Sequence, residues 1–279
     1  MIGKLKRIKE NEVNMEPKVS FITAVKNRAQ ELDEMLQSLI KQDIAEWELI
    51  IVDDHSTEPI QETVEKFNEE RFHYYKLPEN TTGISYGRNL AIDMAKSNIM
   101  IIADGDDINE PNRARVTYDH MTQNNCDVFY GGIRDFTPGK EDKDRLLQPF
   151  NEKLLPMFNF LTNASSAFRR DKFLKLGKFD SNFIVCEDFD LYLRFLNNQC
   201  KFCYTKEILV NYRNSSTSTS ATKFKLLHEY FMKARIKNNI PPFNLDEAKS
   251  YALPYFADKL LNSPQWHDLY IDDRFNEKK

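Results

Sequence analysis

Apolar runs that read as buried strands alternate with helical patterns over the first hundred residues of the chain. The strand-like runs are VSFITAV, WELIIVDD, FHYYKL and NIMIIADGDD. Between the first two, AQELDEMLQSLIKQ places one apolar face at helical spacing: Leu32, Met35, Leu36, Leu39 and Ile40. A charged helical segment is predicted at 58–68, and a further helix holds Ile84, Leu90, Ala91, Met94 and Ala95. This alternation predicts an α/β fold with a mostly parallel, Rossmann-like sheet flanked by helices.

The pattern is less regular after residue 112. It predicts a helix to about residue 124, a strand at CDVFYGGIRDF and a long polar loop over 137–148. The segment EDFDLYLRFLNN predicts a helix with four inward residues: Phe189, Tyr192, Leu193 and Leu196. Two strands follow at CKFCYT and EILVNYR, and then a helical section from about residue 222. We therefore divide the chain into a leader (1–16), one main domain (17–215) and a helical C-terminal extension (216–279).

Composition narrows the class of protein. With 279 residues and 41% hydrophobic content, the chain can bury a sizeable core, so we expect a globular protein. The formal net charge is -4 and the pI is near 5.8, which argues against nucleic acid as a partner. No apolar run approaches about 18 residues, and the N-terminus lacks the apolar core of a signal peptide. We therefore expect a cytoplasmic protein.

The leader is basic and its apolar residues have helical spacing. Ile2, Leu5 and Ile8 are three residues apart, with lysines and an arginine between them. A short amphipathic helix of this kind can lie on an anionic surface, which predicts peripheral contact with the inner membrane face. The competing interpretation is a solvated terminus, because so short a segment buries little area.

The cysteines are few for a chain of this length, and we expect no disulfide framework among Cys126, Cys186, Cys200 and Cys203. The C-x-x-C pair in CKFC has no second pair and no nearby histidine cluster. We therefore interpret its cysteines as residues of an apolar strand and not as a metal or redox site. Any metal ligands must then come from oxygen-bearing side chains.

Two acidic clusters directly follow predicted strands. Asp53 and Asp54 end WELIIVDD, while Asp104, Asp106 and Asp107 end NIMIIADGDD. In parallel sheets, ligands bind beyond the carboxyl ends of the strands, where both clusters are predicted to lie. Carboxylates crowded into one turn repel each other unless water or a cation lies among them. Magnesium and manganese are the ions that such oxygen ligands suit.

Each cluster alone is similar to a motif of phosphoryl-transfer chemistry. LIIVDDH resembles the first strand of a phospho-receiver domain, although in this chain it follows an earlier strand. IIADGDD resembles the nucleophile turn of haloacid-dehalogenase-type phosphatases, although that turn lies near their N-terminus. Each resemblance covers one motif, and a metal-dependent phosphatase or phospho-receiver remains an alternative.

Five blocks taken together resemble the family 2 inverting glycosyltransferases of the GT-A fold. In order they are VSFITAVKNR, WELIIVDDHST, NTTGISYGRNLAIDMAKSNIMIIADGDD, LGKFDSNFIVCEDFDLYLRF and VNYR, which span Val19 to Arg213. The resemblance implies transfer of a hexosyl or N-acetylhexosaminyl group from a nucleotide diphosphate sugar, with a UDP-sugar as the expected donor. The implied acceptor is a hydroxyl of a glycan or lipid-linked molecule in polysaccharide biosynthesis. The resemblance also implies a nucleotide-sugar half at 17–135 and an acceptor half at 136–215.

The same resemblance implies roles for individual residues. Asp106, with Asp104, would hold Mn²⁺ or Mg²⁺ at the leaving diphosphate. Donor contacts are implied for Ala24, Asn27, Asp53, Asp54, Arg88 and Asp104. Asp188 is implied as the base that takes the acceptor proton, and Glu187 is the fallback. Asp190 is expected to be structural and to pair with Arg194, four residues on along the helix.

Two stretches depart from the family pattern. The first strand ends in Ala-Val-Lys-Asn where Pro-Thr-Tyr-Asn is common, so Lys26 replaces an aromatic residue beside the donor base. After the Tyr-Arg pair many members carry a histidine, where this chain has NSSTSTS, and Ser215 is the candidate substitute. His55, next to the first acidic pair, is a further candidate donor contact. These departures keep open a third hypothesis, a GT-A-like binding subunit that has lost activity.

Overall fold

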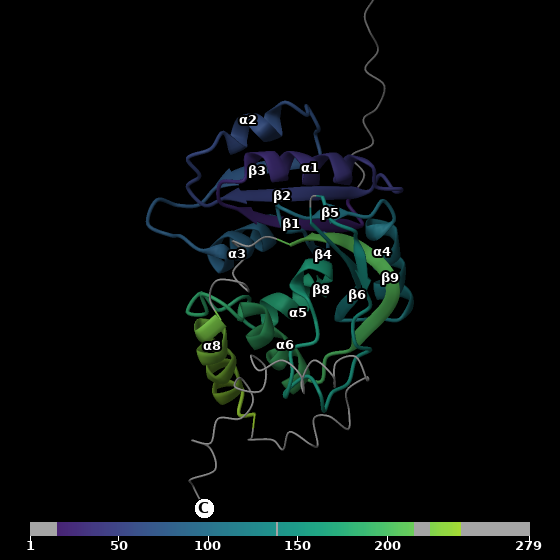
Figure 1. Cartoon of the computed structure of the whole chain (residues 1–279), viewed down its shortest axis with the longest axis vertical. Coiled ribbons are helices and arrows are strands. Elements are labelled where there is room, and N and C mark those ends of the chain that lie inside the picture. Colours follow the sequence, from purple (N-terminus) through teal and green to yellow (C-terminus); the bar gives the residue numbers. More distant parts are fainter. Residues whose placement is uncertain (1–15, 138, 215–223, 241–279) are drawn as a thin grey trace, which may run out of the picture.

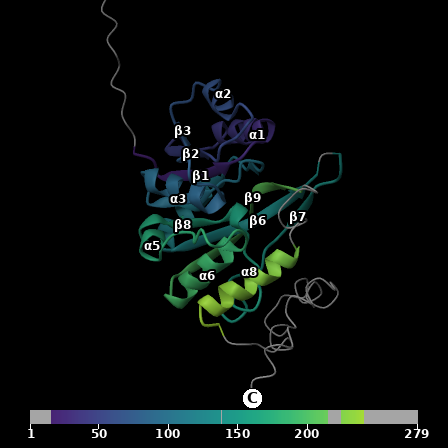
Figure 2. The ribbon, with the colours of Figure 1, turned by 90° about the vertical axis from the view of Figure 1, so that its left-hand side faces the viewer.

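The computed structural model of the chain describes residues 16–137, 139–214 and 224–240 (Figure 1). Their strands form one sheet in the order β3-β2-β1-β4-β8-β6-β9-β5, with β7 paired to β6. Helices cover both faces of this sheet, as two perpendicular views show (Figures 1 and 2). The predicted α/β architecture is therefore confirmed.

The N-terminal part of the sheet is entirely parallel. It contains β1 (Val19–Val25), β2 (Trp47–Asp53), β3 (Phe72–Lys76) and β4 (Ile99–Ile102). The connecting helices are α1 (Ala29–Ile40), α2 (Ile60–Glu65) and α3 (Ile84–Met94). Helices α1 and α2 lie on one face and α3 lies on the other (Figure 1), so alternate apolar residues of each strand enter different cores. The carboxyl ends of these strands therefore meet along one edge.

Beyond β4 the sheet becomes mixed. Strand β8 (Ala167–Arg169) is antiparallel to β4 and to β6 (Val128–Phe136), while β9 (Phe202–Arg213) is parallel to β6. Two short strands, β5 (Ile108–Asn109) and β7 (Lys143–Arg145), add antiparallel pairs with β9 and β6. The remaining elements are α4 (Arg113–Gln123), the 3₁₀ helix η1 (Asn163–Ser165), α5 (Arg170–Lys175), α6 (Glu187–Asn197) and α8 (Phe224–Lys237).

Helix α8 packs along α6, and the two lie side by side in Figure 2. The rings of Phe189 and Phe231 stack with their centroids 4.4 Å apart. The buried carboxylate of Asp190 pairs with Arg194 at 3.0 Å, as expected, and it also accepts a hydrogen bond from Asn238. A lysine of α8 lies on the same carboxylate at 2.9 Å. Asp190 is therefore a structural residue that ties α8 to the helix carrying the candidate base.

Three side chains assigned to the predicted helices are more exposed than their apolar character suggests. Ile40, Ile84 and Met94 keep 42%, 41% and 40% of their surface exposed. Each is the first or last residue of α1 or α3, so it lies beyond the part of the helix that covers the sheet. Periodicity alone does not show which terminal residues of a helix are exposed. It indicates the direction in which a side chain points, but not how far the sheet beneath the helix extends.

Two predicted boundaries also need correction. The polar stretch at 137–148, predicted as a loop, contains β7. Most of CKFCYT and all of EILVNYR belong to one strand, β9 (from Phe202), because the polar residues Lys206 and Glu207 at their junction lie exposed where the pairing of β9 with β6 shifts register. An irregularity of this kind lets a strand continue through a polar interruption.

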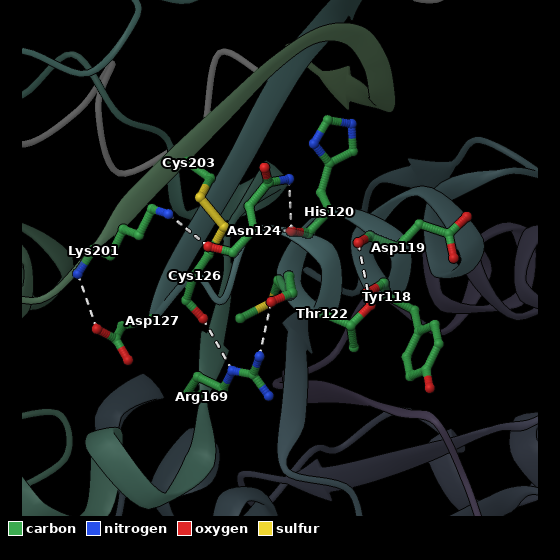
Figure 3. The surroundings of a disulfide bond; sticks show 11 residues. Tyr118, Asp119, His120, Thr122, Asn124, Cys126, Asp127, Arg169, Lys201 and Cys203 are labelled. Atoms are coloured by element: carbon green, nitrogen blue, oxygen red, sulfur yellow. Dashed lines mark hydrogen bonds between the residues drawn. A yellow bond between two sulfur atoms is a disulfide. The ribbon is translucent and has the colours of Figure 1, made fainter.

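A disulfide joins Cys126 to Cys203 (Figure 3), so the expectation for the cysteines needs correction. The two residues are 77 positions apart, but their Cα atoms lie 5.9 Å apart because β6 and the start of β9 are paired. The guanidinium of Arg169 donates to the carbonyls of Cys126 and Met121, which fixes the turn before β6. Spacing cannot reveal such a pair, since it depends on strand order. Cys203 is a strand residue, as expected, but Cys200 is not, because β9 begins at Phe202.

Among the described residues, no helix is both long and apolar enough to span a lipid bilayer. The predicted leader helix, Ser215 and most of the C-terminal extension fall in 1–15, 215–223 and 241–279, outside the described residues.

Candidate active site

The acidic pair at the end of β2 forms a buried polar corner. Both carboxylate oxygens of Asp53 are used, one by the backbone N–H of Ser56 at 2.9 Å and one by the Tyr74 hydroxyl at 2.8 Å. Asp54 accepts through Oδ2 from the Thr82 hydroxyl at 3.0 Å. Its Oδ1 is buried and has no hydrogen-bond partner among the described residues. A buried acceptor without a protein partner is suited to a ligand N–H or O–H.

The end of β1 runs beside this corner. A Cβ atom at Gly87 of α3 would lie 2.7 Å from the Cβ of Ala24, so the helix approaches the strand this closely because residue 87 is glycine. Lys26 is exposed, and its ammonium lies 3.5 Å from Asp54. Lys26, which stands where the resembled family commonly has an aromatic residue, thus places a positive charge beside the acidic pair.

Asn27 joins the loop after β1 to the loop after β2. Its N–H donates to the Ser56 hydroxyl at 2.7 Å, and its side-chain oxygen accepts from the Thr57 N–H at 2.9 Å. Both Asn27 and Arg28 have positive φ angles, of 59° and 67°. Left-handed backbone is uncommon for arginine, so the crosslink to the second loop holds a conformation that the chain would otherwise avoid.

Asp104, Gly105 and Asp106 form a D-x-D turn just after β4. The N–H of Asp107 donates to the carbonyl of Asp104 at 3.1 Å, which closes the turn. Two arginines pair with its carboxylates: Arg88 with Asp104 at 2.5 Å and Arg28 with Asp106 at 2.6 Å. These two carboxylates keep 26% and 29% of their side-chain surface exposed. Asp104 and Asp106 are therefore the two acids of the turn that a solute can reach.

Asp107 is buried behind the turn and has a different environment. Its Oδ1 accepts from the backbone N–H of Arg213 at 2.8 Å, and its Oδ2 has no hydrogen-bond partner among the described residues. Burial and the charges of Asp104 and Asp106 raise the pKa of Asp107 well above its usual value. Asp107 supports the turn from inside and is not a reachable ligand.

The carboxylate oxygens of the turn suit a hard divalent cation that takes its remaining ligands from solute molecules. Burial, and then the charge of Asp104, raise the pKa of Asp106, while the charges of Arg28 and Arg213 oppose the rise. Among the described residues, no three Asp, Glu, His or Cys side chains are grouped to hold a metal ion. An ion at Asp104 and Asp106 would therefore take most of its ligands from solute oxygens, as Mg²⁺ commonly does.

Arg88 connects the D-x-D turn to the start of α6. It is 3% exposed, and it pairs with Asp104 and, at 2.7 Å, with Glu187. The amide of Asn163, with its oxygen turned toward the guanidinium, accepts from both terminal nitrogens at 2.9 and 3.2 Å. The neighbouring carboxylates raise the pKa of Arg88 despite its burial. This arginine is a permanently charged, fully paired group between the two acidic elements.

Asp188, the candidate base, is the second residue of α6. The chain enters this helix through Cys186, whose φ of 57° turns the backbone, and the N–H of Phe189 donates to Asp188 at 2.7 Å. Burial and the adjacent Glu187 raise the pKa of Asp188 to about 7, although Arg88 opposes the rise. Burial therefore outweighs the hydrogen bond from the backbone N–H at the start of the helix.

The predicted site residues fall into two groups that the fold brings to one edge of the sheet. One group is a chain of charged residues: Asp104, Arg88, Glu187 and Asp188. The second group contains Asp53, Asp54 and Asn27. The ion pair of Arg28 with Asp106 links the two groups. His55 lies on this second side, where its ring is 2.9 Å from the carbonyl of Thr81.

Four further residues of the site carried no signal in the sequence. Arg28 and Arg213 are the last residues of VSFITAVKNR and VNYR, where the sequence suggested no role for them, and Asn163 and Glu34 lie in stretches without a motif. Arg213 donates to the backbone carbonyl of Asp106 at 2.7 Å and pairs with Glu34. Such contacts join residues far apart in the chain, so only the folded structure identifies them.

Comparison with known proteins gives the family. Residues 20–199 match Glycosyl transferase family 2, and the chain belongs to that family. It is 27% identical over 231 residues to the O-antigen biosynthesis glycosyltransferase WbnJ of Escherichia coli, covering 78% of this chain and 89% of that protein. It is 25% identical to the UDP-Gal:alpha-D-GlcNAc-diphosphoundecaprenol beta-1,3-galactosyltransferase of Escherichia coli, covering 71% and 75%. The protein is a glycosyltransferase.

Solved structures give the same fold. S. aureus TarS 1-349 in complex with UDP-GlcNAc superposes with a TM-score of 0.69 at 15% identity, over 92% of this chain and 82% of TarS. The mannosyltransferase PcManGT from Pyrobaculum calidifontis, in complex with GDP-Man and Mn²⁺, has a TM-score of 0.59 at 15% identity, over 92% and 84%. The family and the fold exclude the phosphatase and phospho-receiver alternatives, each of which rested on one motif.

Proposed function

We propose that this glycosyltransferase moves a sugar from a UDP-sugar to a hydroxyl of a glycan or lipid-linked acceptor, with inversion at the anomeric carbon. The observation that carries the proposal is the double pairing of Arg88 with Asp104 and Glu187. Through this arginine, the D-x-D turn and Asp188 belong to one cluster at the carboxyl edge of the sheet. A donor diphosphate and an acceptor hydroxyl would meet there.

Asp188 would act as the base of a single displacement. Its carboxylate takes the proton of the acceptor hydroxyl while that oxygen forms a bond to the anomeric carbon. The bond from the anomeric carbon to the diphosphate oxygen breaks, and its electron pair leaves with the nucleoside diphosphate. A pKa of about 7 suits a base that works near neutral pH. The leaving diphosphate needs no proton, so one carboxylate is sufficient.

The nucleotide would bind across the ends of β1 and β2, in the half of the domain at 17–135. The unpartnered Oδ1 of Asp54 is suited to an N–H or O–H of the nucleoside, and Asn27 and Ala24 border the same corner. Asp106 and Asp104 would hold Mn²⁺ or Mg²⁺, which when bound neutralises charge that develops on the leaving diphosphate. The Mn²⁺ in the PcManGT complex supports this assignment.

The acceptor would enter from the half at 136–215, where α6 presents Asp188. The diphosphoundecaprenol-linked substrate in the name of one relative supports a lipid-linked acceptor. UDP-GlcNAc in the TarS complex supports a UDP-sugar over other donors, while GDP-Man in the PcManGT complex marks the main alternative. A lipid-linked acceptor would also require the enzyme to work at the inner membrane face.

The proposal is tested by transfer to a GlcNAc-diphospholipid acceptor from a panel of UDP- and GDP-sugars with Mn²⁺. Nuclear magnetic resonance of the product gives its anomeric configuration. We expect transfer from a UDP-sugar with inversion and its loss in Asp188→Asn. Retention of configuration, or full activity of Asp188→Asn, would contradict the mechanism. Binding of donor and acceptor without transfer would instead favour the inactive binding subunit.

A further inference from the structure

Arg28 is the cation that pairs with Asp106, one of the two reachable carboxylates of the D-x-D turn. Its terminal nitrogen is 2.6 Å from Asp106 Oδ2, and the two side chains keep 35% and 29% of their surface exposed. An arginine in this position occupies the oxygen that a divalent cation would use. The pair is therefore the point at which a bound metal and this side chain compete.

The other arginines around the turn are committed to the protein. Arg88 has 4% of its side-chain surface exposed and pairs with both Asp104 and Glu187. Arg213 has 12% exposed and is held by Glu34 and the carbonyl of Asp106. Arg113 is buried and donates to two backbone carbonyls and to Asn109. Among these four described arginines, Arg28 has the most exposed side chain.

The backbone holds Arg28 in place while its side chain can reorient. Its left-handed φ of 67° opens α1, and the flanking N–H groups of Asn27 and Ala29 are fixed by Ser56 and Glu58 at 2.7 and 2.6 Å. The loop after β2 thus supplies two crosslinks for this one residue. Strained backbone that the surroundings hold in this way clusters at functional sites.

We propose that Arg28 is a donor-diphosphate ligand that is stored on Asp106 until the donor binds. The inference rests on the proposed function and adds a residue and an order of events to it. Without a donor, the guanidinium offsets the charge of Asp106 and opposes binding of a divalent cation alone. When a nucleoside diphosphate and metal arrive together, the carboxylate binds the metal and the guanidinium moves to a phosphate, which it can contact in bidentate fashion.

The exchange keeps every charge paired. Before binding, the Arg28 guanidinium is paired with the Asp106 carboxylate; afterwards the carboxylate faces the metal and the guanidinium faces a phosphate. Metal and nucleoside diphosphate would therefore bind cooperatively. The metal releases Arg28 from Asp106 for the phosphate, and the phosphate draws Arg28 away from the carboxylate that binds the metal. Removing Arg28 should weaken this cooperativity. It should strengthen binding of the metal alone and weaken binding of the nucleoside diphosphate.

Titration of the full-length protein with Mn²⁺ alone, followed by paramagnetic resonance of free Mn²⁺, tests the first half of the exchange. The Arg28→Gln substitution should tighten binding of Mn²⁺ alone by about three- to tenfold, as expected for loss of a partly exposed ion pair. Lys26→Gln is the matched control, since it removes an exposed positive charge two residues away that lies on Asp54 and not on Asp106. This control should change Mn²⁺ binding less than twofold, by about the screened effect of a distant charge.

Calorimetric titration with UDP, and in parallel GDP, at saturating Mn²⁺ tests the second half. Arg28→Gln should weaken nucleotide binding by about tenfold, and Arg28→Lys should restore part of it because a charge without the planar fork remains. Unchanged Mn²⁺ binding in Arg28→Gln would overturn the exchange, whether or not nucleotide binding falls. Unchanged nucleotide binding would overturn it as well. A native protein that binds neither diphosphate with Mn²⁺ would instead contradict the proposed function.

Discussion

The guanidinium of Arg88 donates to the carboxylate of Glu187 at 2.7 Å, although the two residues are 99 positions apart. Its other terminal nitrogen pairs with Asp104. One buried side chain thus sets the distance between the D-x-D turn of β4 and the helix start that carries Asp188. The proposed donor end and the proposed base end of the site therefore belong to one cluster of paired charges.

Loss of Arg88 should damage both the fold and the base. Removing one partner of a buried ion pair leaves charges uncompensated, so Arg88→Met should lower the free energy of unfolding by about 3–5 kcal/mol. Denaturant unfolding measures this. Arg88→Lys keeps the charge but cannot reach Asp104, Glu187 and Asn163 together, so it should recover part of the stability and little of the activity. Equal activity in native protein and Arg88→Lys would show that the bridging geometry is unimportant.

Transfer should fall as the pH drops below about 7, because burial and Glu187 raise the pKa of Asp188 to about 7 and only its carboxylate accepts a proton. The expected acidic limb loses about tenfold in kcat per pH unit. Since the charge of Arg88 opposes the rise, its replacement by a neutral residue should move this limb to higher pH. A limb that lies near pH 4 in the native enzyme would mean that the base has an unperturbed carboxyl pKa.

Asp188→Asn should separate chemistry from binding. We expect kcat to fall by about 10²- to 10⁴-fold, while the Kd for the nucleoside diphosphate changes little. Glu187→Gln is the informative comparison, since Glu187 is already paired with Arg88. If Glu187→Gln lost more activity than Asp188→Asn while remaining folded, Glu187 would be the better assignment for the base.

Reduction of the Cys126–Cys203 disulfide should destabilise the sheet where β6 meets β9. The bond closes a long segment, with a sequence separation of 77 residues, so its loss should cost about 2–4 kcal/mol of unfolding free energy. Thermal melts with and without a reductant measure the effect. The double variant Cys126→Ser with Cys203→Ser should melt at the lower temperature in both conditions. A native midpoint that does not respond to reductant would contradict the stabilising role.

The link between α8 and α6 should respond differently to changes at its two ends. Asp190→Ala leaves the buried ends of Arg194 and Asn238 without their carboxylate, and we expect a loss of about 3–5 kcal/mol. Lys237→Gln removes a partner that is 37% exposed, so the expected loss is about 1 kcal/mol or less. Chemical denaturation of both variants would decide, and equal losses would contradict the buried role of Asp190.

The sequence predicted the part of the site that depends on local pattern. Strands β2 and β4 are buried apolar runs that lead into acidic residues, so the positions of Asp53, Asp54, Asp104 and Asp106 at the carboxyl ends of these strands followed from the pattern and are confirmed. The start of α6 at Glu187 was likewise visible from its inward apolar residues.

What the sequence did not predict depends on tertiary pairing. Arg28 meets Asp106 across 78 positions, and Cys126 meets Cys203 across 77, because non-adjacent strands pair in the sheet. The raised pKa of Asp188 also depends on packing, since burial and the adjacent Glu187 raise it while Arg88 opposes the rise.

The most direct test of the central claim is calorimetric titration of the native protein and Asp106→Asn with UDP, in Mn²⁺ and in a chelator. If the D-x-D turn binds the donor diphosphate through a metal, native protein should bind UDP in Mn²⁺, and both the chelator and the substitution should weaken binding by about tenfold or more. Circular dichroism confirms that the variant is folded. Equal UDP affinity in all four titrations would contradict a metal-dependent donor site at this turn.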